Sequence, residues 1–276
     1  MEKIEEEGAP EDMYLSKGLK CKRERKYQEA FKWFKKAAES GSAEGQCSLG
    51  FCYEKGTGTD RDIGAAFRWY KKAAANGSVD GQILLGLCYE LGKGTATNIG
   101  EAFKCYKIAA ENGNAYGQIL LGMCYELGKG TTTDIAASFR CYKIAAENGN
   151  ANGQYMLGLC HELGKGTDIN TGEAFRWYKK AAENGSADGQ VSLGCFYENG
   201  IGVAKDKGEA FKWFKKAAES GSAEGQFLLG ACYELGKGVP KDKDEALRWY
   251  KKGAENGSAE CQRCLRQCEK KEGKGR

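Results

Sequence analysis

Apolar residues recur at helical spacing in the stretch SVDGQILLGLCYELGKG, which begins at Ser78. One face of the predicted helix carries Gln82, Leu85, Gly86 and Tyr89. Ser78 is a natural N-cap, because its hydroxyl can accept a hydrogen bond from the first turn of the helix. We therefore predict a helix in this stretch and call it helix A.

A second apolar pattern fills the stretch IGAAFRWYKKAAANG, residues 63–77. Its apolar stripe consists of Ala66, Tyr70, Ala73 and Ala74. Gly77 stands where a helix commonly ends on a left-handed residue, so this stretch is predicted to be a second helix, helix B. The glycines inside helix A, Gly50 and Gly86, each cost about 1 kcal/mol in a helix interior. We expect them to let the alanines of helix B approach closely.

Both patterns repeat every 36 residues without an insertion. One column of helix A holds Gln46, Gln82, Gln118, Gln154, Gln190, Gln226 and Gln262, and its N-cap column holds Ser42, Ser78, Asn114, Asn150, Ser186, Ser222 and Ser258. A fixed period of this length is typical of solenoids, because one helix pair cannot bury its apolar face without a stacked neighbour. The predicted fold is all-α: an α-solenoid superhelix of about seven antiparallel helix pairs plus a C-terminal capping helix.

The two ends of the chain depart from the period and mark the predicted domain boundaries. Gly18 and Ala30 are twelve residues apart, whereas Gly50 and Ala66 are sixteen apart. The last stretch, AECQRCLRQCEKKEGK, keeps the spacing of helix A but is polar, as a terminal cap must be. The predicted parts are an acidic tail at 1–11, a single repeat array at 12–271 and a tail at 272–276. Within the array we predict a first unit at 12–41, six units at 42–257 and the capping helix at 258–271.

The motifs LGxCYE.GKGT and EAFRWYKKAAENG resemble the Sel-1-like repeat, a relative of the tetratricopeptide repeat. The resemblance covers about Pro10 to Cys268, and the shorter first unit resembles an ordinary tetratricopeptide repeat. It implies a right-handed superhelix with the A helices on its concave side, and a role as an adaptor or scaffold of protein complexes. A secreted branch of the family staples each repeat with a disulfide. Its cysteines fall where this chain has pairs such as Ala38 and Gln46, so those staples are absent here.

Composition and charge narrow the expected location. The net charge of +4 does not by itself indicate nucleic acid as a partner. The first residues, MEKIEEEGAPED, are acidic and lack the apolar core of a signal peptide. No apolar run approaches the ~18 residues that a membrane span needs. We expect a monomer in the cytoplasm or nucleus, not secreted and without a membrane span, with its thirteen cysteines reduced.

No residue pattern indicates catalysis, a cofactor or a metal site. One column of helix A holds Cys52, Cys88, Cys124, Cys160, Cys232 and Cys268. Stacked helices lie ~8–10 Å apart, which exceeds the ~7 Å reach of a disulfide, and zinc would need four converging ligands. We interpret these cysteines as small buried residues. His161 stands in the tyrosine column and is expected to be a packed substitute, so we expect a protein that is not an enzyme.

The GKGT segments at 92–95, 128–131 and 164–167 follow a helix rather than a strand. They also lack the residue order of a phosphate-binding loop. We interpret them as turns between helix A and helix B.

The face of helix B opposite its apolar stripe is basic and is flanked by tryptophan. Its residues are Arg68, Lys71 and Lys72 beside Trp69, with equivalents at Lys32, Lys35, Lys36, Arg176, Lys179, Lys180, Lys212, Lys215, Lys216, Arg248, Lys251 and Lys252. We interpret this basic stripe as a solvated convex face with cations near helix C-termini. The alternative is a surface for RNA or anionic lipid. In two middle units Cys105 and Cys141 replace tryptophan while Ile108 and Ile144 replace lysine, which indicates either a private binding patch or drift after a duplication.

Helix A is apolar on the face opposite its core face as well. This predicted groove consists of Ile83, Leu87, Leu91, Ile119, Met123, Leu127, Tyr155, Leu159, Leu163, Phe227 and Leu235. Beside it runs a predicted acidic ladder of Glu54, Glu90, Glu126, Glu162, Glu198 and Glu234. A helix that is apolar all round is buried on both sides or lines a groove. We therefore expect a non-enzymatic scaffold that holds a segment of a partner protein in an apolar, acid-edged groove.

Overall fold

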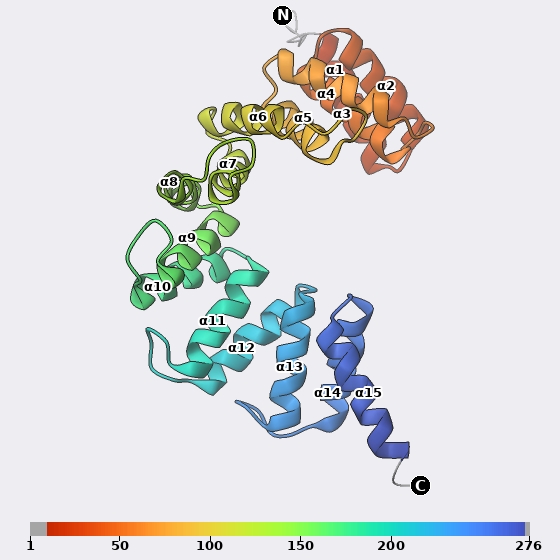
Figure 1. Cartoon of the computed structure of the whole chain (residues 1–276). Coiled ribbons are helices and arrows are strands. Elements are labelled where there is room, and N and C mark those ends of the chain that lie inside the picture. The colour runs from red at the N-terminus through yellow and green to blue at the C-terminus, as the bar shows by residue number, and fades with distance from the viewer. Residues whose placement is uncertain (1–9, 274–276) are drawn as a thin grey trace, which may run out of the picture. The chain divides into compact units, whose positions relative to one another are not determined.

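The computed structural model describes the backbone of residues 10–273 and the side chains of residues 11–267. The chain divides into two compact units, Met1–Asp134 and Ile135–Arg276, and Figure 1 shows only helices and connecting loops in their described parts. The first unit holds α1 (Pro10–Arg23), α2 (Tyr27–Glu39), α3 (Ala43–Lys55), α4 (Ile63–Ala75), α5 (Val79–Leu91), α6 (Ile99–Glu111) and α7 (Ala115–Leu127). The second holds α8 (Ile135–Glu147), α9 (Ala151–Leu163), α10 (Thr171–Glu183), α11 (Ala187–Asn199), α12 (Lys207–Glu219), α13 (Ala223–Leu235), α14 (Lys243–Glu255) and α15 (Ala259–Gly273).

The odd-numbered helices carry the pattern of helix A and the even-numbered helices that of helix B. The described chain thus contains seven A/B pairs in sequence followed by a final A helix, which confirms the predicted all-α class. Helix α1 begins at Pro10, slightly before the predicted start of the array, and α15 continues to Gly273. Residues 1–9 of the expected acidic tail, residues 274–276 and the side chains of Lys270 and Lys271 lie outside the described residues.

Polar caps begin the helices at the predicted positions. In α5, the Ser78 hydroxyl accepts a hydrogen bond from the Gly81 amide at 2.9 Å. The same bond begins α3, α7, α9, α11 and α13. Five B helices, α4, α6, α10, α12 and α14, have their own side-chain caps, which the sequence patterns had not indicated. In α4, Asp62 accepts from the Ala65 amide at 2.8 Å. Helix boundaries therefore follow from local side-chain chemistry.

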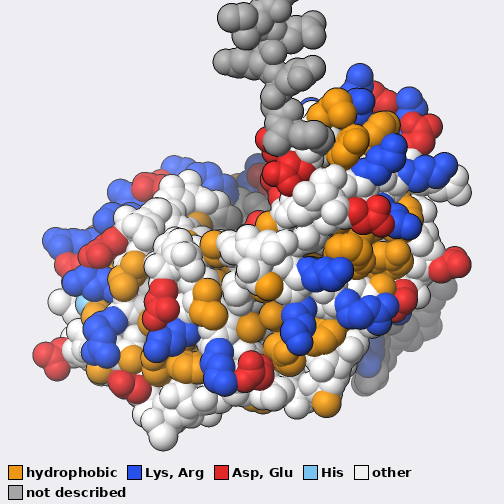
Figure 2. All heavy atoms as spheres, turned by 90° about the horizontal axis from the view of Figure 1, so that it is seen from above, with side chains coloured by type: hydrophobic (Ala, Val, Ile, Leu, Met, Phe, Trp, Pro, Cys, Tyr) orange, Lys and Arg blue, Asp and Glu red, His pale blue; other side chains and the backbone are white. Residues whose placement is uncertain are grey.

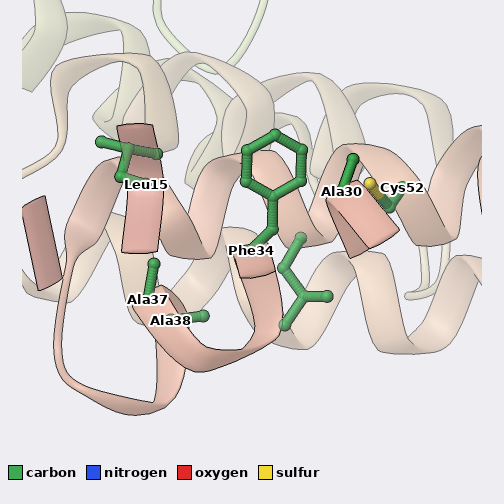
Figure 3. Close-up of a cluster of buried hydrophobic side chains, with 7 residues drawn as sticks. Leu15, Ala30, Phe34, Ala37, Ala38 and Cys52 are labelled. Carbon is green, nitrogen blue, oxygen red and sulfur yellow. The ribbon is translucent and has the colours of Figure 1, made fainter. Parts of the chain in front are cut away.

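The core lies between the paired helices, where an aromatic ring of helix B packs among small residues. In the first unit, Figure 3 shows the Phe34 ring with Leu15, Ala30, Ala37, Ala38 and Cys52 around it. Tyr70 and Tyr106 occupy the same column in α4 and α6, each with only 1% of its surface exposed. The predicted stripe of helix B is therefore confirmed as its core face.

The glutamine column joins successive repeats through hydrogen bonds. The Gln46 side-chain amide donates to the Ala38 carbonyl at 3.2 Å, at the end of the preceding B helix. Its carbonyl oxygen accepts from Asn76, at the end of the B helix of its own repeat, at 3.0 Å. Asn184 and Gln154 form the same bond in the second unit at 2.9 Å. A polar residue is thus retained on the core face because it satisfies backbone groups at a helix end.

The expectation for the glycines inside helix A is corrected. A side chain at Gly86 would meet the Tyr106 ring at 2.5 Å, rather than the alanines of helix B. The alanine contact belongs to another column, where a side chain at Gly81 would meet the Ala73 Cβ at 2.9 Å. The reason is that helix A packs on two B helices. Its first turn meets the alanines of the preceding one, and its middle meets the tyrosine of the following one.

The remaining structural predictions concern turns, cysteines and histidine. Gly92 and Gly94 adopt left-handed conformations with φ of 66° and 71°, which confirms GKGT as a turn. Five residues of the cysteine column are buried, and Cys268 lies outside the described side chains; none of the twelve described cysteines is in a disulfide. The His161 ring packs edge-on against Phe139 with centroids 5.7 Å apart, as the Tyr125 ring does against Phe103 at 5.5 Å. His161 is thus a packed substitute for tyrosine. None of the fifteen described helices has the length and apolar character needed to cross a membrane.

Candidate binding groove

The last residue of each of four A helices is a leucine that stays in contact with solvent. The exposed fractions are 58% for Leu91 and 59% for Leu127 in the first unit. They are 51% for Leu163 and 53% for Leu235 in the second. Each leucine precedes a left-handed glycine that ends its helix. We call these four residues the exposed leucines.

Two residues of the predicted groove expose little surface. Ile83 and Ile119 are each only 6% exposed, so most of each side chain is packed inside the first unit. They lie in the first halves of α5 and α7, which glycine–alanine contacts hold close to the preceding B helices. Along α7 the exposed fraction rises from 6% at Ile119 through 38% at Met123 to 59% at Leu127. Among the predicted groove residues, exposure therefore rises toward the C-terminal ends of these helices.

The other predicted groove residues are half-buried. Leu87 and Leu159 lie midway along their helices. The Tyr155 ring packs against Tyr178 with centroids 5.8 Å apart, and the Phe227 ring lies 6.2 Å from that of Tyr250. Part of each aromatic side chain therefore belongs to the core of the second unit, and only the remainder is available to a partner.

The predicted acidic ladder is occupied by intramolecular bonds. Glu54 accepts hydrogen bonds from the Tyr70 hydroxyl at 2.9 Å and from Lys93 at 3.2 Å. Glu90 accepts from Tyr106 at 2.8 Å and from Lys129 at 2.6 Å. Each lysine comes from the GKGT turn of the next repeat, 39 residues away. These carboxylates link neighbouring repeats and do not form a free anionic edge.

The other glutamates of the ladder also interact with groups within the protein. Glu198 is bound by Lys237 at 2.6 Å, and the nearby Phe214 has no hydroxyl to donate. Glu234 accepts from Tyr250 at 2.7 Å, Glu162 accepts from Tyr178, and Glu126 is not free either. Burial acts to raise the pKa of Glu54 and Glu90, but the bonds from tyrosine and lysine outweigh it and hold both pKa values below the ordinary range.

A different column carries the unpaired negative charge of the A helices. Glu44 and Asp80 in the first unit, and Asp188 and Glu224 in the second, lie exposed in the first turn of their helices. None of the four is in an ion pair with a described residue. An acid is favoured in the first turn of a helix because the partial positive charge of the helix N-terminus stabilises it. The sequence-based predictions did not include this column, although its acids stand at multiples of 36 residues.

The first unit also contains a hollow of about 390 Å³ on its A helices. Its wall includes Cys47 and Ser48 of α3, where α5 carries Ile83 and Leu84 and α7 carries Ile119 and Leu120. The hollow thus lies where this repeat carries smaller residues than the two that follow it. Of the residues that line this hollow, only Ile83 was predicted to be part of a binding surface.

Most cations of the basic stripe of the B helices contact groups within the protein. The ammonium of Lys72 lies 4.4 Å from the Trp69 ring centroid, and four other lysine–tryptophan pairs have the same arrangement. Arg176 pairs with Glu173 at 2.6 Å, as do the equivalent pairs on α6, α12 and α14. Figure 2 shows Lys and Arg side chains interspersed with Asp and Glu side chains and with hydrophobic ones. The contacts of the stripe give the alternative function no support, although Lys71, Lys179 and Lys251 form no ion pair with a described residue.

The middle units show why lysine and tryptophan change together. Cys105 is 5% exposed, and Ile108 keeps 41% of its surface exposed in the first unit. Ile144 is 48% exposed in the second. Without a tryptophan ring, a lysine at this position has no π-face to lie on.

Within the described residues, no three His, Cys, Asp or Glu side chains converge as a metal site requires.

Comparison with known proteins identifies the repeat. Seven consecutive segments match the family model described as the Sel1 repeat, at residues 9–42, 43–78, 79–114, 115–150, 151–186, 187–222 and 223–258. The first match includes the unit that resembles a tetratricopeptide repeat. Together with the helices, these matches confirm the predicted resemblance and the α-solenoid class.

Solved structures agree with the family match. The chain is similar to c5321, a protective antigen of uropathogenic Escherichia coli strains displaying an SLR fold, with 34% identity and a TM-score of 0.75. The match covers 91% of this chain but only 55% of that protein. A Sel1 repeat protein from Oxalobacter formigenes has 28% identity and a TM-score of 0.78, with 87% and 96% of the two chains covered. Immunity protein Pa5087 of Pseudomonas aeruginosa, at 18% identity and a TM-score of 0.54, shares the fold. Comparison with the curated proteins gave no match.

Proposed function

Because the chain belongs to the Sel1 repeat family, whose members generally serve protein interaction, we propose that it is a non-enzymatic scaffold. It holds a segment of a partner protein against its A helices. The exposed leucines are the apolar anchors of this surface, with Leu91 and Leu127 in the first unit and Leu163 and Leu235 in the second. The acidic edge is supplied by Glu44, Asp80, Asp188 and Glu224 rather than by the predicted ladder.

The observation that carries the proposal is the residue choice at the exposed leucine position. The same column holds Lys55 in α3 and Asn199 in α11, and both are exposed. Polar residues therefore fit this position, so folding does not require leucine there. Large apolar side chains left half-exposed at equivalent sites are typical of interaction surfaces. A partner would remove them from water at about 25 cal/mol per Å² of apolar area.

The test is partner recovery with a double variant. The immobilised full chain recovers proteins from a cell extract, and the Leu91→Asp/Leu127→Asp variant is compared with the parent. We expect recovery of a specific partner to fall about tenfold or more, since removing an interface anchor costs 1 kcal/mol or more. Asn199→Asp is the matched control, because it adds charge at the same position without removing leucine. Unchanged recovery by a folded double variant would refute the proposal.

A further inference from the structure

The hollow of the first unit results from a local change in the repeat. Position 48 is serine in α3, whereas the neighbouring α5 and α7 carry Leu84 and Leu120 there; α11 also has a serine, Ser192, but beside the larger Val191 in place of Cys47. Position 47 is cysteine, and its thiol lies 3.3 Å from the Ser78 hydroxyl. The remaining wall is apolar at its base, where Ala30, Phe34 and Cys52 are buried. An apolar space of about 390 Å³ therefore opens on the A-helix surface of the first unit.

Three aromatic residues line the hollow and remain open to solvent. Their exposed fractions are 43% for Tyr27, 39% for Phe51 and 46% for Tyr116. Tyr116 stands in the column where α3 and α5 carry the acids Glu44 and Asp80. Aromatic side chains supply much of the binding energy of protein interfaces, because they bury a large apolar area at low entropic cost.

The charges around the hollow are of opposite sign on different sides. Glu44 and Asp80 line it without an ion pair to any described residue. The ammonium of Lys22 lies 5.1 Å from the Phe51 ring centroid, and that of Lys55 lies 5.9 Å from it. A positively charged group of a bound segment is therefore attracted to the two carboxylates. It is repelled near Phe51, where the two lysines lie.

We propose that this hollow is a side-chain pocket for a peptide segment in which a large apolar residue has a lysine or arginine next to it on one side. The apolar side chain enters the space above Phe34 and Cys52. The cation reaches Glu44 and Asp80, and the Phe51 side excludes a second cation. This inference rests on the proposed function, because it names the partner chemistry of the same A-helix surface. Leu91 and Leu127 lie on α5 and α7, two of the helices that line the hollow.

The direct test uses defined peptides and the full chain. Three labelled probes share a Gly-Ser background and contain Trp-Lys, Trp-Glu or Gly-Lys at their centre. Binding is followed by anisotropy and by the ring signals of Tyr27, Phe51 and Tyr116 in NMR spectra. We expect the Trp-Lys probe to bind and to shift these signals. The other two should bind about tenfold more weakly or not at all, since each loses one of two contacts.

Two variants separate the hollow from its charges. Ser48→Leu restores the residue of the neighbouring repeats, so we expect it to fold like the parent and to lose Trp-Lys binding. Glu44→Gln/Asp80→Asn should bring the affinities for Trp-Lys and Trp-Glu to within about twofold, because exposed ion pairs are weak but selective. The matched control is Glu183→Gln/Glu255→Gln, which removes two exposed acids at the ends of the B helices α10 and α14 and should leave probe binding unchanged.

Several outcomes would overturn the inference and leave the proposed function standing. Equal binding of Trp-Lys and Trp-Glu by the parent would remove the charge selectivity. Full Trp-Lys binding by Ser48→Leu would place the probe elsewhere. Tryptamine binding as tightly as the peptide would indicate a small-molecule site. Self-association that Ser48→Leu abolishes, without probe binding, would make a second copy the occupant. In each case, loss of partner recovery in Leu91→Asp/Leu127→Asp would still support the scaffold.

Discussion

The core column of the B helices holds either tyrosine or phenylalanine, which differ by one hydroxyl group. Tyr106 donates it to Glu90 at 2.8 Å, whereas Phe214 has none to give to Glu198. We expect Tyr106→Phe to lower the free energy of unfolding by about 1 kcal/mol or somewhat more, because a partly buried carboxylate loses one of two donors. Urea unfolding followed by circular dichroism measures the difference. Phe214→Tyr is the reverse control and should not destabilise the protein.

The loss in Tyr106→Phe should depend on pH. The pKa of Glu90 is held below its ordinary value in the folded chain despite the opposing effect of burial. Its contribution is therefore fully present above the unfolded pKa and is lost as pH falls through the folded one. The difference between variant and parent should shrink in that acid range. A difference that stays constant down to full protonation would show that the tyrosine acts through packing alone.

Gly86 tests the close approach of helix A to a tyrosine ring. In an ordinary helix interior, glycine to alanine gains up to about 1 kcal/mol. Here the added Cβ would lie 2.5 Å from Tyr106 Cε1, so we expect Gly86→Ala to cost about 1–3 kcal/mol through overpacking. Thermal unfolding measures it. Gly100→Ala is the control, since its Cβ would meet nothing closer than 3.6 Å and α8 carries Ala136 at that position. Equal melting temperatures for the two variants would contradict the expectation.

At the scale of the helix, burial changes along one apolar face. Sequence spacing places Ile119 and Leu127 on comparable apolar columns, but only the second is open to water. A charge at Ile119 would be buried without a partner, which costs several kcal/mol. A charge at Leu127 would stay hydrated. The two positions therefore differ in energy because of their place along α7, not because of their chemistry.

We expect Leu127→Asp to melt within a few degrees of the parent, since ~1 kcal/mol shifts a domain of this size by ~2–4 °C. Ile119→Asp should lose far more or fail to fold. Differential scanning calorimetry of both variants is the measurement. A strongly destabilised Leu127→Asp would mean that the exposed leucines are packing residues and would withdraw them from the binding surface.

Across the whole molecule, the cysteines form columns of buried thiols. Burial raises the pKa of Cys52, Cys88 and Cys124 to about 11. Because the thiolate is the reactive form, we expect these residues to resist alkylation near neutral pH and to react faster as pH rises toward that value. Mass spectrometry of the folded chain measures the order of labelling. Rapid labelling of these cysteines at neutral pH would contradict their burial.

The denatured chain is the companion measurement. Without reductant it should accept thirteen labels, because the predicted state of every cysteine is the free thiol. None of the twelve described cysteines is in a disulfide in the structure, and Cys268 is tested only by this experiment. A chain that accepts markedly fewer labels would contain disulfides.

The sequence by itself determined the features that depend on local spacing. The caps at Ser78 and its equivalents, the GKGT turns and the core face with Tyr70 and Ala73 follow from contacts within a few residues. The 36-residue period then made each assignment recur in every unit. The pairing of lysine with tryptophan on helix B was not predicted, although the sequence shows that both change together where Cys105 and Ile108 appear.

Only the tertiary structure decided which groups from different repeats meet. Lys93 reaches Glu54 across 39 residues, so the apparent acidic ladder became a set of links, and the free acids proved to be Glu44 and its equivalents. The approach of neighbouring helices buried Ile83 while leaving Leu91 in water. The same packing left a hollow beside the small residues Cys47 and Ser48. Periodicity places a residue on a helix face. The distance to the next repeat decides whether that residue is buried in the core, forms a hydrogen bond to another repeat or stays exposed to solvent.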